Sequence, residues 1–389
     1  MRRKFFTALI FGVLTTLLVA CSGGQSTTGR EDVIKLGLNL ELSGGVSSYG
    51  QSLREGMLLA IEEINDNGGI LDKKIEYVEI DNKSDAAEAA SVATRLTSEE
   101  QVFAIMGAAT SGNTKAQIEI ANDTKTLLIT PSGTSPDLTV NEDGSVNEYV
   151  FRVSYIDPFQ GEIAAQFAVE ELGVNSAAVY YDNASDYSQG LAKSFTDKFE
   201  ELGGTVVIQE SFVAGDTDFR STLTRIKGED PEFIYIPAYY EEVGLIIAQA
   251  RELGIDVPLM GADGWDSPKL IELAGPNALN NTFITNHYSA QDPDEKIQEF
   301  VEKFKNKYDG KSPDAFNALG YDAIYMLKDA IERADKLDTT AVKEALEATE
   351  GLELISGTIT IDENHNPIKS ATILEYKDGE QVFRSKIDP

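Results

Sequence analysis

From residue 33 onward, short apolar runs alternate with segments in which apolar residues recur at helical spacing. The run at 34–40 predicts a strand, and Leu53, Met57 and Ile61 share one face of the helix predicted next, which a Gly-Gly pair ends. The series continues with strand 74–80, helix 86–96, strand 102–106, helix 115–122 and strand 127–129. This alternation predicts a doubly wound α/β lobe.

A second series of the same order and spacing follows the first. It predicts helix 159–172, strand 177–181, helix 190–202, strand 205–212, helix 219–226, strand 233–236, helix 243–253 and strand 258–260. Long helices at 296–308 and 315–334 then precede a β-rich tail at 358–386. The fold class is therefore α/β, with two doubly wound, Rossmann-like lobes.

The order of the segments also predicts how the lobes are joined. If the late helices return to the first lobe, the chain crosses between the lobes more than once and forms a multi-crossing hinge. We expect lobe 1 to contain 32–152 and about 286–360, and lobe 2 to contain 153–285 and about 361–389.

The N-terminus is typical of a secretion signal. Basic residues at 2–4 precede an uncharged run at 5–19, which is too short to span a bilayer. The run ends in Leu-Val-Ala-Cys21, which resembles the lipobox of bacterial lipoproteins and implies signal peptide 1–20, lipidation of Cys21 and a flexible tether 21–31. The alternative is an ordinary cleaved signal with an incidental cysteine.

Composition excludes several classes of function. The chain has 65 acidic and 33 basic side chains and a net charge of −32, which repels nucleic acid and anionic lipid surfaces. His287 and His365 are too few and too far apart for a zinc site, and Cys21 is the only cysteine. No G-x-S-x-G motif is present, and Asn113 stands where a phosphate-binding loop needs lysine. We expect no enzyme activity, no metal and no cofactor.

Polar residues follow corresponding strands of the two series. Ser111 and Thr134 come after strands of the first series, and Tyr239 and Asp263 after strands of the second. Open α/β sheets bind ligands at such strand ends, so two facing lobes would bring these residues to one cleft. The loop 107–112 would offer backbone N–H groups and the Ser111 hydroxyl to a carboxylate, although a plain helix cap explains Ser111 equally well. Asp263 would face an ammonium group or simply form a turn.

Six segments carry a resemblance to a known family: LSGGVSSYG (42–50), AIEEINDNGGI (60–70), GAATSGNT (107–114), ITPSGTSPDLT (129–139), DNASDYSQGLAKSF (182–195) and GDTDF (215–219). Together they resemble the substrate-binding proteins of branched-chain amino-acid ABC transporters, which have the type I periplasmic-binding-protein fold. The resemblance covers nearly the whole chain after the leader. It implies that Ser111, Thr134 and the backbone at Ser132 bind a ligand carboxylate and that Asp263 meets the ammonium.

The resemblance also implies a full set of contact residues and two departures. The expected ligand contacts are Tyr49, Thr110, Ser111, Ser132, Gly133, Thr134, Tyr187, Tyr239, Asp263 and Trp265. Where the well-known leucine/isoleucine/valine binder has a glutamate, this chain has the shorter Asp263, and Thr110 replaces one cysteine of a disulfide. Trp265 beside the shorter acid would fill space, and Phe316 is a further candidate for the apolar wall.

The implied function is that of an extracytoplasmic solute-binding lipoprotein of an ABC importer, lipid-anchored to the outer face of the cell membrane. It would bind a neutral L-amino acid, with leucine, isoleucine or valine favoured, and deliver it to the permease subunits by hinge closure, as a monomer. An amino-acid or amide sensor on the same fold and an extracellular enzyme are the alternatives. The lipobox argues against cytoplasmic sensors, and the missing catalytic set argues against an enzyme.

Overall fold

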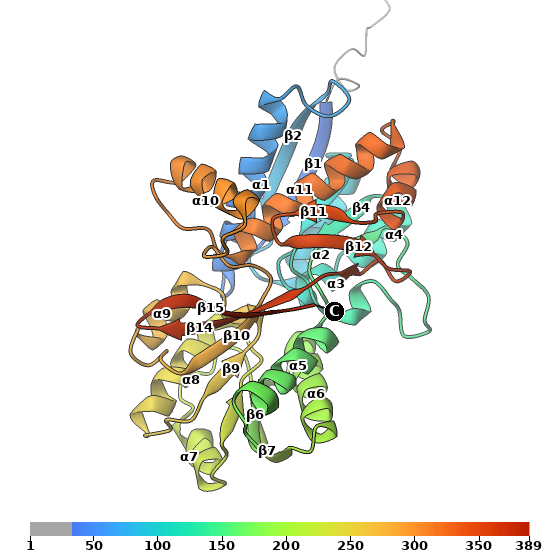
Figure 1. Ribbon diagram of the computed structural model, residues 1–389. Coiled ribbons are helices and arrows are strands. Elements are labelled where there is room, and N and C mark those ends of the chain that lie inside the picture. Colours follow the sequence, from blue (N-terminus) through green and yellow to red (C-terminus); the bar gives the residue numbers. More distant parts are fainter. Residues whose placement is uncertain (1–32, 389) are drawn as a thin grey trace, which may run out of the picture. The chain divides into compact units, whose positions relative to one another are not determined.

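Five parallel strands form the first sheet, in the order β2–β1–β3–β4–β5. Its first two strands, β1 and β2, lie side by side in the blue part of the chain in Figure 1. The computed structural model describes residues 33–388, so the predicted signal peptide, Cys21 and the tether lie outside the described residues. The strands are β1 (Val33–Leu40), β2 (Lys74–Asp81), β3 (Ala104–Gly107), β4 (Leu127–Thr130) and β5 (Val150–Arg152). Their connecting helices are α1 (Ser47–Asp66), α2 (Ala86–Ser98), α3 (Ser111–Lys115), α4 (Ile118–Thr124) and the 3-10 turn η1 (Pro136–Leu138). We call this sheet and its helices the first lobe.

Alternate side chains of the first sheet pack against different helices. Ala104 and Met106 of β3 belong to the core that α1 shares with a later helix, α11 (Ala315–Ala334). Ile105 lies between them in sequence and belongs to the core formed with α2 and α4. Successive side chains of a strand point to opposite faces, so a strand covered on both faces is apolar throughout. The predicted doubly wound lobe is confirmed.

Seven strands form the second sheet, in the order β15–β14–β10–β9–β8–β6–β7. They are β6 (Ser176–Asp182), β7 (Thr205–Phe212), β8 (Phe233–Tyr235), β9 (Leu259–Gly261), β10 (Thr282–Asn286), β14 (Ala371–Lys377) and β15 (Glu380–Ile387). The pairs from β7 to β10 are parallel, and β14 and β15 add antiparallel strands at one edge. We call this sheet and its helices the second lobe.

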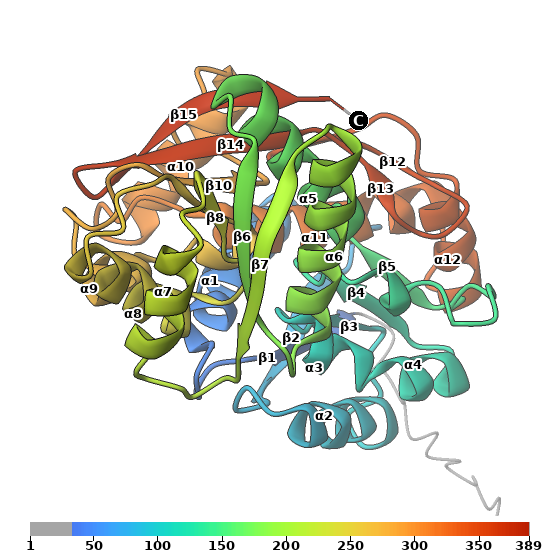
Figure 2. The same cartoon turned by 90° about the horizontal axis from the view of Figure 1, so that it is seen from below.

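The second lobe is also covered on both faces. Its helices are α5 (Asp157–Gln166), the π-helical turn η2 (Phe167–Glu171), α6 (Asp186–Glu201), α7 (Arg220–Gly228), α8 (Tyr240–Glu252), the 3-10 turn η3 (Asp263–Trp265) and α9 (Pro268–Ala274). Figure 2 shows α5 and α6 on one side of β6 and β7, with α7 and α8 on the other. Val179 of β6 packs in the core with α5 and α6, whereas Tyr180 packs in the core with α7 and α8.

The remaining chain returns to the first lobe before it ends in the second. It forms α10 (Glu295–Lys307), α11, α12 (Thr339–Glu347) and a small antiparallel sheet of β11 (Leu352–Leu354), β12 (Gly357–Ile361) and β13 (Pro367–Ile368). α11 lies along α1, so closely that a Cβ on Gly56 would stand 1.9 Å from the Asn317 carbonyl oxygen. Within residues 33–388 the chain therefore passes between the lobes after Arg152, after Asn286 and after Ile368.

Some predicted elements differ from the structure. The helix predicted at 115–122 is two short helices, α3 and α4. The side-chain amide of Gln117 donates to the Asn113 carbonyl at 3.0 Å, and the Gln117 backbone N–H donates to Thr114 instead. In an uninterrupted helix the Gln117 backbone N–H would donate to that Asn113 carbonyl, so the hydrogen-bond pattern is interrupted at Gln117. The helix predicted at 159–172 begins at Asp157 and ends as the π-helical turn, and strands β5 and β10 were not predicted.

No helix in the described part of the chain combines the length and the apolar character that crossing a membrane requires.

Candidate functional site

A small cavity lies between the two lobes. It is lined by Tyr49, Ala109, Thr110, Ser111, Ser132, Thr134, Tyr187, Tyr239, Asp263, Gly264 and Phe316. Most of these residues follow the carboxyl ends of β3, β4, β8 and β9, and the others lie in the first turns of α1, α6 and α11. The cavity therefore occupies the place where open α/β sheets bind ligands.

The lobes touch each other around this cavity. The Tyr240 hydroxyl of the second lobe donates to the Gly45 carbonyl of the first at 3.0 Å, and Lys115 of α3 pairs with Asp186 of α6 at 2.9 Å. The hydroxyls of Ser48 and Ser267 are 2.7 Å apart. The structure is a closed form, in which a bound molecule would be cut off from bulk water.

Eight of the ten predicted contact residues line the cavity, but Gly133 and Trp265 do not. Trp265 is fully buried within the second lobe, where its Nε1–H donates to the Ile236 carbonyl at 2.9 Å. The Gly133 N–H donates to the Thr130 hydroxyl, and its carbonyl accepts from Arg152 and Ser154. Both residues pack behind the residues that line the cavity, and neither faces it.

The hydroxyls of Ser111 and Ser132 play different chemical roles. Ser111 Oγ accepts hydrogen bonds from the backbone N–H groups of Thr134 at 3.3 Å and Ser135 at 3.2 Å. Its lone pairs are thus engaged, and its own proton is left to donate. Ser132 Oγ donates to the Ala109 carbonyl at 2.8 Å, so it keeps lone pairs that accept. Ser111 therefore suits an anionic ligand group and Ser132 a cationic one.

Glu41 changes the predicted use of the 107–112 loop. This fully buried carboxylate accepts from the N–H groups of Ala109 and Thr110 at 2.9 and 3.1 Å, and from the Thr110 hydroxyl and Asn113 side chain at 3.0 and 2.8 Å. The expectation that the backbone N–H groups of this loop hold a ligand carboxylate is wrong for Ala109 and Thr110, because these groups already donate to Glu41. Within the 107–112 loop, the donors that remain for a ligand begin at Ser111.

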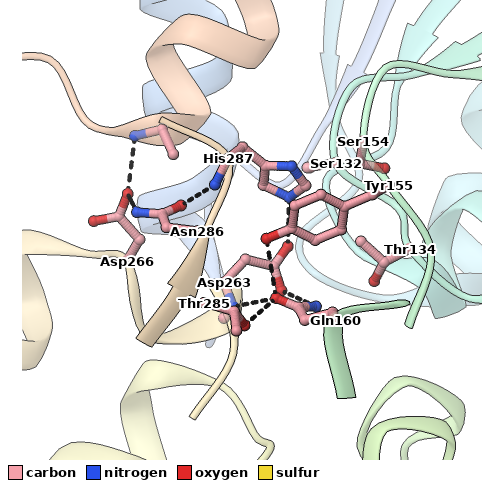
Figure 3. A network of polar contacts seen from close by, with 12 residues as sticks. Ser132, Thr134, Ser154, Tyr155, Gln160, Asp263, Asp266, Thr285, Asn286 and His287 are labelled. Atoms are coloured by element: carbon pink, nitrogen blue, oxygen red, sulfur yellow. Dashed lines mark hydrogen bonds and ion pairs between the residues drawn. The ribbon is translucent and has the colours of Figure 1, made fainter. Parts of the chain in front are cut away.

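Asp263 stands in the second lobe and is 3% exposed. Its Oδ1 accepts from the Gln160 side-chain amide at 3.0 Å, and its Oδ2 lies 3.1 Å from His287 Nε2 (Figure 3). Oδ1 also accepts from the Tyr187 hydroxyl at 2.8 Å. Gln160 is itself fixed, because its Oε1 accepts from the Asp263 backbone N–H and the Thr285 hydroxyl. Asp263 therefore holds one orientation before any ligand arrives.

Asp157 lies beside the cavity without lining it, and sequence reasoning missed it. It opens α5 directly after the first crossing, and its backbone N–H donates to the carbonyl of Thr134, which lines the cavity. The side chain is fully buried, and neither carboxyl oxygen has a hydrogen-bond partner. Burial raises the pKa of Asp157 well above its usual range, while nearby Thr134 and Arg152 act in the opposite direction. An unsatisfied buried carboxyl of this kind is typical of a functional site.

Aromatic rings supply the apolar walls. Tyr49 stacks on Phe316 at 4.4 Å between ring centroids, and Tyr187 stacks on Tyr239 at 4.9 Å. The Tyr49 hydroxyl donates to the Gly264 carbonyl, and the Tyr187 hydroxyl donates to Asp263. Burial raises the pKa of both phenols well above the usual range. These residues therefore offer a ligand their ring surfaces, because their protons are already engaged.

No three His, Cys, Asp or Glu side chains within residues 33–388 gather closely enough to hold a metal ion. The acidic groups of the cavity lack the clustered ligand set that metals require.

Two α/β lobes that close over a small cavity at their strand ends, with polar groups on both lobes and aromatic walls, define a solute-binding protein. The family model described as periplasmic binding protein matches residues 33–381, and the chain belongs to this family. Its fold is therefore the type I periplasmic binding protein fold.

Individual relatives agree with this assignment. A leucine-, isoleucine-, valine-, threonine- and alanine-binding protein of Pseudomonas aeruginosa is 30% identical over 95% of this chain and 96% of its own. The leucine-binding protein LivK of Thermotoga maritima is 38% identical with a TM-score of 0.86, covering 92% of this chain and 99% of LivK. The branched-chain amino-acid transporter substrate-binding protein LivJ of Streptococcus pneumoniae, solved in complex with isoleucine, is 36% identical with a TM-score of 0.86 over 92% of this chain and all of LivJ.

Proposed function

We propose that this protein binds a neutral L-amino acid with an aliphatic side chain, with leucine, isoleucine or valine favoured, and delivers it to the permease of an ABC importer. The ligands named for the similar proteins support this choice. In the proposal, lipidated Cys21 anchors the protein outside the cell membrane, and the folded body acts as a monomer.

One observation carries the choice of an amino acid: the cavity has opposite chemistry at its two ends. The Ser111 hydroxyl offers a proton on the first lobe, whereas Asp263 offers a fixed negative charge on the second. A zwitterion placed between them matches both ends, and its charges need such partners in a closed cavity. Among the described residues, neither arginine nor lysine lines the cavity, so a ligand with only a negative charge finds no counter-ion there.

Hinge motion supplies delivery in this proposal. The ligand carboxylate docks on Ser111 and Thr134 of the first lobe, and closure then brings Tyr187, Tyr239 and Asp263 over it. The closed form buries the ligand's side chain against the stacked rings. The permease would recognise this loaded form, since the contacts around the cavity form only on closure.

Isothermal titration calorimetry on ligand-stripped protein tests the proposal. Protein unfolded, washed and refolded is titrated with L-leucine, L-isoleucine, L-valine, L-threonine and L-alanine. We expect binding of the branched-chain amino acids, together with a rise in apparent melting temperature. Two leucine analogues serve as controls: 4-methylpentanoate lacks the ammonium, and 3-methylbutylamine lacks the carboxylate. Binding of either analogue as tight as that of leucine, or no binding of any amino acid, would contradict the proposal.

A further inference from the structure

His287 has a place in the site that its sequence position did not reveal. It follows β10 at the second crossing and is 3% exposed. Its Nε2 lies 3.1 Å from Asp263 Oδ2, and its ring stacks on Tyr155 with 3.8 Å between centroids. Its backbone N–H donates to the Asn286 side chain, which in turn donates to Asp266 (Figure 3). The contacts with Asp263 and Tyr155 and the backbone hydrogen bond to Asn286 thus fix the orientation of His287.

The surroundings select one protonation state of this ring. Nδ1 is buried and has no hydrogen-bond partner. A neutral ring protonated on Nε2 donates to Asp263 and leaves only a lone pair unsatisfied. The other tautomer would set a lone pair against the carboxylate, and the imidazolium would bury an N–H without an acceptor, which costs more. Burial lowers the pKa of His287 to about 4, even though Asp263 raises it, which agrees with a neutral ring.

The hydrogen bonds of Asp263 indicate which of its oxygens receives the ligand. A carboxylate oxygen accepts about two hydrogen bonds. Oδ1 already accepts from Gln160 and Tyr187, whereas Oδ2 has only His287. The free acceptor position therefore lies on Oδ2, the atom that His287 contacts.

We propose that His287 is a positioning residue for ammonium recognition: its neutral Nε2–H fixes Oδ2 of Asp263 while leaving the carboxylate charge for the ligand. A lysine or arginine at this place would pair with Asp263 and compete with the ligand's ammonium. A neutral donor orients the same oxygen without cancelling its charge. This inference rests on the proposed amino-acid ligand.

Two substitutions separate positioning from packing, because they predict opposite orders of affinity. His287→Gln keeps an N–H donor near the Nε2 position but loses the stack on Tyr155. His287→Phe keeps a ring on Tyr155 but loses the donor. With leucine or isoleucine as titrant, we expect His287→Gln to bind within about threefold of wild type and His287→Phe to bind about 10- to 100-fold more weakly. If the ring acts only through packing, His287→Phe binds normally and His287→Gln is the impaired variant, which would overturn the inference.

His365 provides a matched control. It is also 3% exposed and stacks on Phe151 at 4.2 Å, but it does not line the cavity. His365→Gln should leave affinity unchanged. Wild-type protein that binds none of the amino acids would refute the proposed function, whereas wild-type binding with the reversed order of the two His287 variants refutes only the role of His287.

A spectroscopic measurement covers the case in which the His287 variants do not fold. The chain contains two histidines, so long-range ¹H–¹⁵N spectra of the wild-type imidazoles show two ring systems, which His365→Gln assigns. At pH 7 we expect His287 to carry its proton on Nε2 and a bare Nδ1, with the Nε2 signal moving when leucine is added. A protonated Nδ1, in either the neutral or the charged ring, would overturn the inference.

Discussion

Replacing Asp263 with asparagine removes one charge from the site and little else. The asparagine side chain keeps an oxygen where Gln160 and Tyr187 donate, and its amide N–H₂ then occupies the position of Oδ2. That group would face both the His287 Nε2–H and the ligand's ammonium, so two attractive contacts become repulsive. The variant therefore measures what a single carboxylate contributes to ligand binding.

The structure places the expected cost in the upper part of the usual range. Removing one charge of a buried pair costs about 2–5 kcal/mol. Asp263 is 3% exposed, so solvent screens it little. His287 could escape the clash only by moving its proton to Nδ1, which has no acceptor. We expect a loss of about 3–5 kcal/mol, equivalent to a dissociation constant raised about 100- to 5,000-fold.

The assay is calorimetry with leucine on stripped Asp263→Asn protein, beside Asp197→Asn as a control. Asp197 is 63% exposed and pairs only with Lys193 on the surface of α6, so its variant should bind as wild type does. The preference for leucine over 4-methylpentanoate should also shrink in Asp263→Asn. A variant that melts as wild type does without ligand, yet binds leucine within threefold of wild type, would refute the assignment of the ammonium to Asp263.

Three further changes test other parts of the site. Ser111→Ala should weaken leucine binding about tenfold or more and lower the melting temperature of the free protein, because it removes the donor and leaves the N–H groups of Thr134 and Ser135 unpaired. Unchanged affinity would show that Ser111 only holds the backbone at 134–135 in place. Asp157→Asn should stabilise the free protein at pH 7. The pKa of Asp157 is raised in the folded state, so folding opposes its ionisation, and the free energy of unfolding falls as the pH rises above the pKa that Asp157 has in the unfolded chain. Equal melting temperatures for variant and wild type at pH 7 would contradict this. His287→Gln should make the protein less sensitive to acid. In wild type the pKa of His287 is about 4 in the folded state and about 6.5 in the unfolded chain, so this residue lowers the free energy of unfolding by up to about 3 kcal/mol as the pH falls between these values. Urea titrations of both proteins at pH 7 and 4.5 should show the difference.

Hydrophobic periodicity predicted the layered fold because both sheets are covered on two faces. Buried runs such as Phe233–Tyr235 have no polar side to present, and helices such as α1 show one apolar face. The same approach missed β5 and β10. β5 is three residues long, and β10 carries polar threonine and asparagine that are buried only because neighbouring strands and helices cover them.

Site residues that directly follow a strand could be predicted from the sequence. Residues that are brought to the site by contacts between distant parts of the chain could not. Ser111 and Asp263 follow strands, so topology alone brings them to the cleft. Asp157 was missed because β5, the strand before it, was not recognised. Glu41 was missed because its contacts with the 109–113 segment join residues about seventy positions apart, and local sequence carries no sign of them.

The single tryptophan of the chain, Trp265, can serve as a fluorescent reporter of the site. Trp265 lies two residues after Asp263, its indole is fully enclosed, and its N–H is bonded to a backbone carbonyl. The tryptophan emission of the native protein therefore comes from one homogeneous environment beside the acid that is expected to meet the ligand. A change in that emission on adding an amino acid reports on this one position, so opening and closing can be followed in unlabelled protein and at stopped-flow speed.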